Sequence, residues 1–286
     1  MKICLFNNHR IGVVIEEDVV DVSDAFTPVL KSTWPFPLAD ADIENFDGVR
    51  DEVERMSKVG VRMPLSTVRL LAPVANPSKI IGAPINYKDH IAEANADAQI
   101  NHGKTYTELD KFGLFLKSNS SLIGCSQEVE IPFAERRTDH EVELAVIIGR
   151  KGRGISRENA LDYVFGYSIG LDMTVRGPEF PGFRKSADTF SVLGPWIVTK
   201  DEIGDPNSLD LAIKVNGEVK QDSNSKYLIF DVQRLIEYAS ATYTLYPGDV
   251  IMTGTPAGVG PIAPSDVMEA SIACIGSMKV RIAKHL

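Results

Sequence analysis

The chain has 286 residues, of which 44% are hydrophobic, and its formal net charge is −9. This length allows one large domain, or one large and one small domain, with a substantial core. The acidic balance and the lack of a lysine- or arginine-rich cluster argue against a nucleic-acid or anionic-membrane partner and suit a soluble enzyme. No segment approaches about 18 uninterrupted apolar residues, and the first residues do not resemble a secretion signal, so we expect a cytoplasmic protein.

Residues 1–75 are predicted to form a small N-terminal domain. An amphipathic helix is indicated over residues 43–60, where apolar residues recur with helical spacing, and a proline-rich bend is expected at residues 34–38. Residues 72–79 contain two prolines, which is typical of a linker or turn. Short strands are expected at residues 2–6, 11–16 and 19–23.

Residues 76–286 are predicted to form a larger, mostly β domain. Its β-like runs outnumber its helices and do not alternate regularly with them, which favours an α+β fold over a doubly wound one. Helices are indicated at residues 86–96, 156–165 and 231–240, with Asn86, Ser156 and Asp231 available as N-caps. The β-like runs lie at residues 79–84, 114–118, 128–132, 140–149, 165–175, 195–199, 211–217, 249–254, 267–275 and 278–283.

The three cysteines, Cys4, Cys125 and Cys274, are isolated along the chain. Their odd number and the lack of a Cys-x-x-Cys spacing argue against a disulfide framework and against a thiolate zinc site. Because free cysteine is usually buried, we interpret all three as packing residues.

Two glutamates stand one residue apart at the start of the apolar run at residues 140–149. Side chains alternate along a strand, so Glu141 and Glu143 share a face with their Cβ atoms about 6–7 Å apart. Like charges at that distance are costly without a positive charge between them, and Asp172 offers a third carboxylate. Three carboxylates without histidine or cysteine favour Mg²⁺, Mn²⁺ or Ca²⁺. The spacing leaves open a solvated strand edge at which these acids pair with Arg136, Arg137 or Arg176.

His90 and Glu93 are three residues apart in the helix expected at residues 86–96, so they share a helix face. A histidine whose tautomer is fixed by a carboxylate can act as a general base that activates water. The alternative is a surface histidine with an incidental acidic neighbour.

Two further segments carry polar groups of possible use to a binding site. Arg184 and Lys185 precede a Gly-Pro turn, where a basic side chain either lies in solvent or neutralises an anionic substrate or enolate. Residues 248–260 form a glycine-rich loop without a nucleotide-binding pattern. Its backbone N–H groups and the hydroxyls of Thr253 and Thr255 either bind a carboxylate or form a plain tight turn.

Taken in order, these segments resemble the fumarylacetoacetate hydrolase family over roughly residues 79–283. The matching stretches are NYKDHIAE, LFLKSNSSLIG, DHEVELAVIIGRKGRGIS, YVFGYSIGLDMTVR, KSADTFSVLGPWIVT, VNGEVKQ and LYPGDVIMTGTPAGVG. The resemblance implies a mixed β-roll around a Mg²⁺ or Mn²⁺ site, in a homodimer. One departure is Gly177 after Arg176, followed by a short loop that borders the substrate pocket in relatives.

The resemblance also implies roles for individual residues. The metal ligands would be Glu141, Glu143 and Asp172. The catalytic residues would be His90, Glu93 and Lys185, with the first two on a lid helix. Substrate contacts would come from Tyr87, Arg176 and Thr255.

The activity that the resemblance implies is hydrolysis of a small 2-oxo acid in aromatic catabolism. A 2,4-dioxo acid such as an acylpyruvate or fumarylpyruvate would be cleaved at a carbon–carbon bond through a metal-stabilised pyruvate enolate. The alternative is a decarboxylase or isomerase of a related 2-oxo diacid, such as oxaloacetate or a 2-hydroxy-dienedioate. A non-catalytic member that uses the metal only for stability also stays open, although it would need only the three acids.

Overall fold

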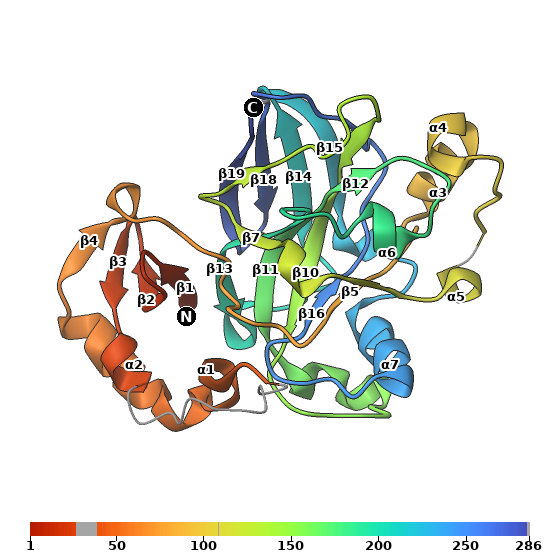
Figure 1. Cartoon of the computed structure of the whole chain (residues 1–286). Helices are drawn as coiled ribbons and strands as arrows, with labels where there is room; N and C mark the ends of the chain where they lie inside the picture. The colour runs from red at the N-terminus through yellow and green to blue at the C-terminus, as the bar shows by residue number, and fades with distance from the viewer. Residues whose placement is uncertain (27–38, 108, 285–286) are drawn as a thin grey trace.

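An 11-stranded mixed sheet runs across the molecule (Figure 1). The computed structural model describes residues 1–26, 39–107 and 109–284, so the bend expected at residues 34–38 lies outside the described residues. In spatial order the strands are β4 (Arg62–Pro64), β3 (Asp18–Asp21), β2 (Arg10–Ile15), β1 (Lys2–Phe6), β13 (Ser191–Thr199), β11 (Val164–Asp172), β10 (Val142–Ile148), β16 (Val250–Met252), β5 (Ile80–Gly82) and β6 (Phe115–Lys117), with β7 (Leu122–Gly124) beside β13.

Two smaller sheets complete the roll. The first has five strands, in the order β15 (Glu218–Asn224), β14 (Asp210–Val215), β18 (Val267–Ile272), β19 (Gly276–Ile282) and β8 (Glu128–Val129). The second has three strands, in the order β12 (Thr174–Val175), β9 (Thr138–His140) and β17 (Gly260–Pro261). Strands dominate and helices are few, so the predicted α+β, mostly β fold class is confirmed.

The N-terminal strands continue the main sheet. β1 pairs antiparallel with β13, and β2, β3 and β4 follow outward from it. The long helix α2 (Phe46–Val59) buries Phe46 and Val53 against the apolar side chains of these strands. The division between residues 1–75 and 76–286 stays a prediction.

Strand β10 forms the centre of the core. All seven of its residues are buried because β11 and β16 flank it and both of its faces are covered. Val142, Leu144, Val146 and Ile148 belong to one apolar cluster, whereas Ala145 and Ile147 belong to another. This division is what the alternation of side chains along a strand predicts.

Several short helices gather on one side of the roll, at the right of Figure 1. Of the three N-caps predicted from the sequence, that of α7 is confirmed. The carboxylate of Asp231 accepts the N–H of Arg234 at 2.8 Å. No helix within the described ranges is both long and apolar enough to span a membrane. The remaining helices are α1 (Ala41–Glu44), α3 (Lys88–Ala96), α4 (Ala98–Asn101), α5 (Leu109–Phe112) and α6 (Pro181–Arg184), while α7 spans Val232–Thr242.

Four local predictions are wrong. The expected Gly-Pro turn is not a turn, because Gly194 and Pro195 lie within β13. The segment 156–165 is a 3₁₀ helix (Arg157–Tyr163), and Val164 already begins β11, because its β-branched side chain packs in the sheet opposite Ile148. Asn86 does not cap α3, since its amide donates to the carbonyls of Phe230 and Thr253. Cys274 is exposed, with φ of 64°, because it lies in the tight turn between β18 and β19.

Candidate active site

The three predicted carboxylates meet in one buried cluster. Glu141 precedes β10, Glu143 lies within it, and Asp172 ends the neighbouring strand β11. The backbone N–H of Asp172 donates to the carbonyl of Glu141 at 2.9 Å, which fixes the register of the two segments. One carboxylate oxygen from each residue lies within 4.8 Å of the others, and none of the three residues is more than 3% exposed. The alternative of a solvated strand edge is therefore wrong.

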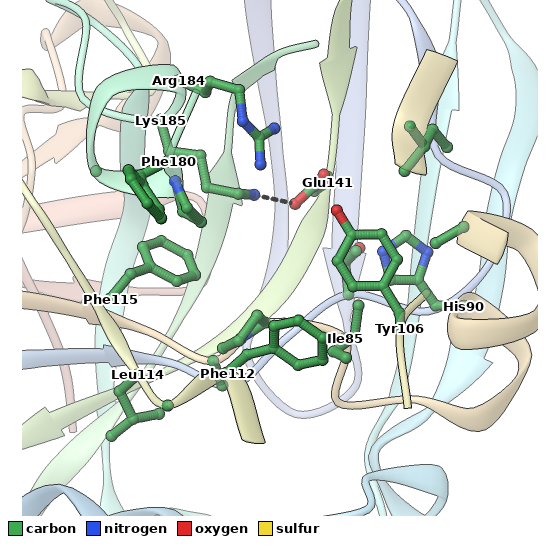
Figure 2. Close-up of a pocket in the computed structure, with 18 of the residues that line it drawn as sticks. Ile85, His90, Tyr106, Phe112, Leu114, Phe115, Glu141, Phe180, Arg184 and Lys185 are labelled. Atoms are coloured by element: carbon green, nitrogen blue, oxygen red, sulfur yellow. Dashed lines mark hydrogen bonds and ion pairs between the residues drawn. The ribbon is translucent and has the colours of Figure 1, made fainter. Parts of the chain in front are cut away.

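Basic side chains neutralise part of this cluster. The ammonium of Lys185 donates to Glu141 Oε2 at 2.6 Å and to Asp172 Oδ2 at 2.7 Å; the first bond is drawn in Figure 2. Lys117 donates to the other oxygen of Asp172. Arg176 donates to Glu141 Oε1 at 2.9 Å and to Asp139 Oδ2 at 2.8 Å.

The surroundings shift the pKa values of Glu141 and Glu143 in opposite directions. Burial alone raises the pKa of Glu141, but Lys185 and Arg176 outweigh it and hold that pKa well below its usual range. Burial and the charge of Asp172 raise the pKa of Glu143 well above its usual range. Among the described residues, the carboxylate of Glu143 has only the N–H of Gly254, at 2.7 Å, as a hydrogen-bond partner.

This donor set fits a hard divalent cation. Carboxylate oxygens are the ligands that Mg²⁺ and Mn²⁺ prefer, and they converge here from two adjacent strands. Lysines already pair with Glu141 and Asp172, so Glu143 is the member of the set without a basic partner among the described residues, and a bound cation would take the place of its proton.

The histidine and glutamate of helix α3 form a hydrogen-bonded pair. Nδ1 of His90 lies 2.8 Å from Oε2 of Glu93, and Oε1 of Glu93 accepts the N–H of Gly258 at 2.8 Å. With Glu93 ionised, Nδ1 carries the proton and Nε2 is left as the acceptor. His90 is only 5% exposed and lines the same pocket as the carboxylates, so the alternative of a surface histidine is wrong.

A pocket of about 550 Å³ joins these groups. Figure 2 shows His90 on one side of it and Lys185 and Arg184 on the other, with Glu141 between them and aromatic rings along the base. A volume in this range is typical of small-molecule sites. Of the predicted site residues, the lining contains His90, Glu141, Glu143, Arg176, Lys185 and Thr255.

Of the predicted site residues, Tyr87, Glu93 and Asp172 are outside this lining, whereas Thr255 is part of it. Tyr87 is 2% exposed, and its hydroxyl has no hydrogen-bond partner in the described part of the chain. Burial raises the pKa of Tyr87, so the hydroxyl stays protonated. Thr255 donates its hydroxyl to the carbonyl of Val142 at 2.9 Å and accepts from Gln221 at 2.7 Å.

Two basic residues at this site were not assigned a role from the sequence. Lys117 is fully enclosed and also donates to the carbonyl of Phe190 at 2.8 Å. In the sequence, a lysine next to the apolar residues of LFLKS is the feature that indicates a buried basic residue. Arg184 lines the pocket and is buried, whereas the sequence pattern leaves it either in solvent or beside an anionic substrate.

Comparisons with known proteins agree with this geometry. The family model described as "Fumarylacetoacetate (FAA) hydrolase C-terminal" matches residues 79–283. A maleylpyruvate hydrolase from Aquipseudomonas alcaligenes is 51% identical over 284 residues, which cover 99% of each chain.

Solved structures share the fold of this chain. A maleylpyruvate hydrolase from Sphingobium sp. SYK-6, in complex with manganese(II) and pyruvate, superposes with a TM-score of 0.86 at 38% identity over 100% of both chains. A 2-hydroxyhepta-2,4-diene-1,7-dioate isomerase from Mycobacterium marinum has a TM-score of 0.67 at 35% identity, covering 79% of this chain and 82% of its own. This chain is thus similar both to hydrolases and to an isomerase.

Proposed function

The chain belongs to the fumarylacetoacetate hydrolase family, and we propose that it is a metal-dependent hydrolase that cleaves maleylpyruvate or a closely similar 2,4-dioxo acid at a carbon–carbon bond. The observation that carries the proposal is a single pocket in which a carboxylate-held histidine faces a buried carboxylate cluster. Similarity to a maleylpyruvate hydrolase along 99% of each chain supports the choice of substrate. A homodimer in the cytoplasm is part of the same proposal.

Glu141, Glu143 and Asp172 would hold the metal, Mg²⁺ or Mn²⁺. When bound, the metal supplies a Lewis acid that holds the 2-oxo acid end of the substrate and offsets negative charge there. Lys185 donates hydrogen bonds to two of these carboxylates. Its ammonium therefore lies beside the metal site and would also offset negative charge on the 2-oxo acid end of the substrate.

His90 and Glu93 would handle the proton. Nε2 of His90 takes a proton from a water molecule while Glu93 holds the ring through Nδ1. The hydroxide adds to the carbonyl carbon at position 4, and the bond between C3 and C4 breaks with its electrons on the pyruvate fragment. The proton on His90 then goes to C3, so that water and maleylpyruvate become maleate and pyruvate.

Isomerisation or decarboxylation is the second candidate, because the isomerase from Mycobacterium marinum has a related structure. A 2-oxo diacid can give the same pyruvate enolate by losing carbon dioxide, or can isomerise through an enolate, without an attacking water. Oxaloacetate and a 2-hydroxy-dienedioate are the corresponding substrates.

The test is the decay of ultraviolet absorbance of maleylpyruvate and of acetylpyruvate with purified protein, with Mn²⁺ and with EDTA. We expect loss that requires the metal, with equimolar pyruvate and the matching acid as products. Turnover of oxaloacetate without hydrolysis of either dioxo acid would replace this proposal with the second candidate.

A further inference from the structure

Arg184 is a buried cation in the pocket without an acidic partner. It is 7% exposed, and its one hydrogen bond in the described part of the chain runs from Nε to the carbonyl of Glu179, at 2.9 Å. Its two terminal nitrogens are not bonded to any described residue, and Figure 2 shows the guanidinium extending into the pocket. Burial lowers the pKa of Arg184, and the charge of Arg176 lowers it further, yet an arginine stays protonated in a protein.

The basic residues at the carboxylate cluster differ from Arg184 in this respect. Lys185 pairs with Glu141 and Asp172, and Arg176 pairs with Glu141 and Asp139. A buried charge is costly unless an opposite charge or hydrogen bonds compensate it. The pocket therefore offers one uncompensated planar donor, which suits an anionic ligand.

The loop before Arg184 is held firmly in place. Arg136 donates to the carbonyl of Arg176 at 2.8 Å and to both carboxylate oxygens of Glu179 at 3.1 and 2.8 Å. The carboxylate of Glu179 is thus hydrogen-bonded to Arg136, and the hydrogen bond from Arg184 goes to the Glu179 carbonyl. A Cβ at Gly177 would lie 1.9 Å from Nη2 of Arg136, so a larger residue there would displace the Arg136 guanidinium. These contacts fix the direction in which Arg184 points.

Arg184 and Lys185 are consecutive residues at the end of helix α6, so their side chains diverge. Lys185 reaches the carboxylate cluster, where the 2-oxo acid end of the substrate would bind. Arg184 lies above Lys185 in Figure 2, and its guanidinium extends into the pocket on the side away from the rings of Phe115 and Phe180. A ligand held at the cluster by its 2-oxo acid end would thus meet both apolar surface and the Arg184 guanidinium within the same pocket.

We propose that Arg184 binds a second carboxylate at the far end of the substrate and makes the enzyme selective for 2,4-dioxo acids that carry one. The inference rests on the proposed function and names the residue that recognises the acyl part. A guanidinium and a carboxylate form two parallel charge-assisted hydrogen bonds, which a neutral acyl group cannot make. Arg184 acts in binding and takes no part in proton transfer.

The test compares two substrates on one variant of the Mn²⁺-loaded enzyme. Arg184→Gln should lower kcat/KM for maleylpyruvate on the order of 100-fold, mainly through KM, because the far carboxylate is held equally before and during reaction. For acetylpyruvate, which has no far carboxylate, the change should stay within about threefold, which also shows that the variant is folded. Arg184→Lys should recover part of the loss. Arg153→Gln removes an exposed arginine outside the pocket and should leave both substrates unaffected.

A binding measurement separates this inference from the proposed hydrolysis. Calorimetry with 2-oxopimelate and 2-oxoheptanoate compares a 2-oxo acid with and without a far carboxylate. The native protein should bind 2-oxopimelate more tightly, and Arg184→Gln should remove that preference, whether or not either dioxo acid is hydrolysed.

Three results would overturn the role of Arg184: equal losses for maleylpyruvate and acetylpyruvate, no loss for maleylpyruvate, or equal native affinity for the two 2-oxo acids. If the native enzyme hydrolyses neither dioxo acid but binds the diacid through Arg184, the proposed function fails and the inference stands.

Discussion

Replacing Glu93 by glutamine tests whether Glu93 acts by deciding which nitrogen of His90 carries the proton, or only by the size of its side chain. Glutamine keeps the size of the side chain, and its oxygen can still accept the N–H of Gly258, now at 2.8 Å from Oε1. Its NH₂ group must then face Nδ1 of His90, which lies 2.8 Å from Oε2 in the native pair. Nδ1 becomes an acceptor, so the ring proton moves to Nε2. The nitrogen directed at the pocket can no longer take a proton from water.

The expected loss follows from the contribution of general-base catalysis, which is about 10²–10⁴-fold. At about 1.4 kcal/mol per factor of ten, this raises the barrier by roughly 3–5 kcal/mol. The assay is the initial rate at saturating maleylpyruvate with Mn²⁺. We expect kcat to fall by that factor, while KM and the midpoint of thermal unfolding change little.

Asp89→Asn is the matched control, because Asp89 also carries a carboxylate on the same helix but is exposed. It should retain native kcat. A loss in Glu93→Gln of less than about tenfold would refute the tautomer argument, since general-base catalysis contributes more than that. If decarboxylation of oxaloacetate fell as much as hydrolysis, water activation by His90 would also be refuted, because decarboxylation needs no attacking water.

The remaining predictions concern the metal, the core and the thiols. Glu143→Ala removes one of three converging carboxylates. The affinity for Mn²⁺, measured by titration, should therefore fall at least about 100-fold, and turnover should be lost. Full activity of this variant would contradict the metal assignment. Leu144→Ala empties a site that is 1% exposed in β10 and should lower the free energy of unfolding in urea by about 2–5 kcal/mol; a loss below about 1 kcal/mol would argue against that packing. Iodoacetamide at pH 8 should label the exposed Cys274 first, as detected by peptide mass. Burial raises the pKa of Cys4 to about 12, so about one Cys4 thiol in 10⁴ is ionised at this pH. Equal labelling of Cys274 and Cys4 would contradict this.

The sequence by itself determined the features that depend on local periodicity. Alternation along a strand put Glu141 and Glu143 on one side of β10, and helical spacing put His90 beside Glu93. The cap of α7 by Asp231 also followed from neighbours in the chain. In each case the relevant geometry is fixed within a few residues, so the pattern is visible in one segment.

Tertiary structure decided the contacts between segments far apart in sequence. Asn86 bonds to Phe230 and Thr253 instead of capping its own helix, because burial makes those carbonyls its partners. Lys117 meets Asp172 across 55 residues, a contact that only the placement of β6 beside the cluster creates. The direction of Arg184 depends on Arg136, which crosses Gly177 to hold the loop. Spacing within a segment carries no information about such partners, since the register of distant strands and loops brings them together.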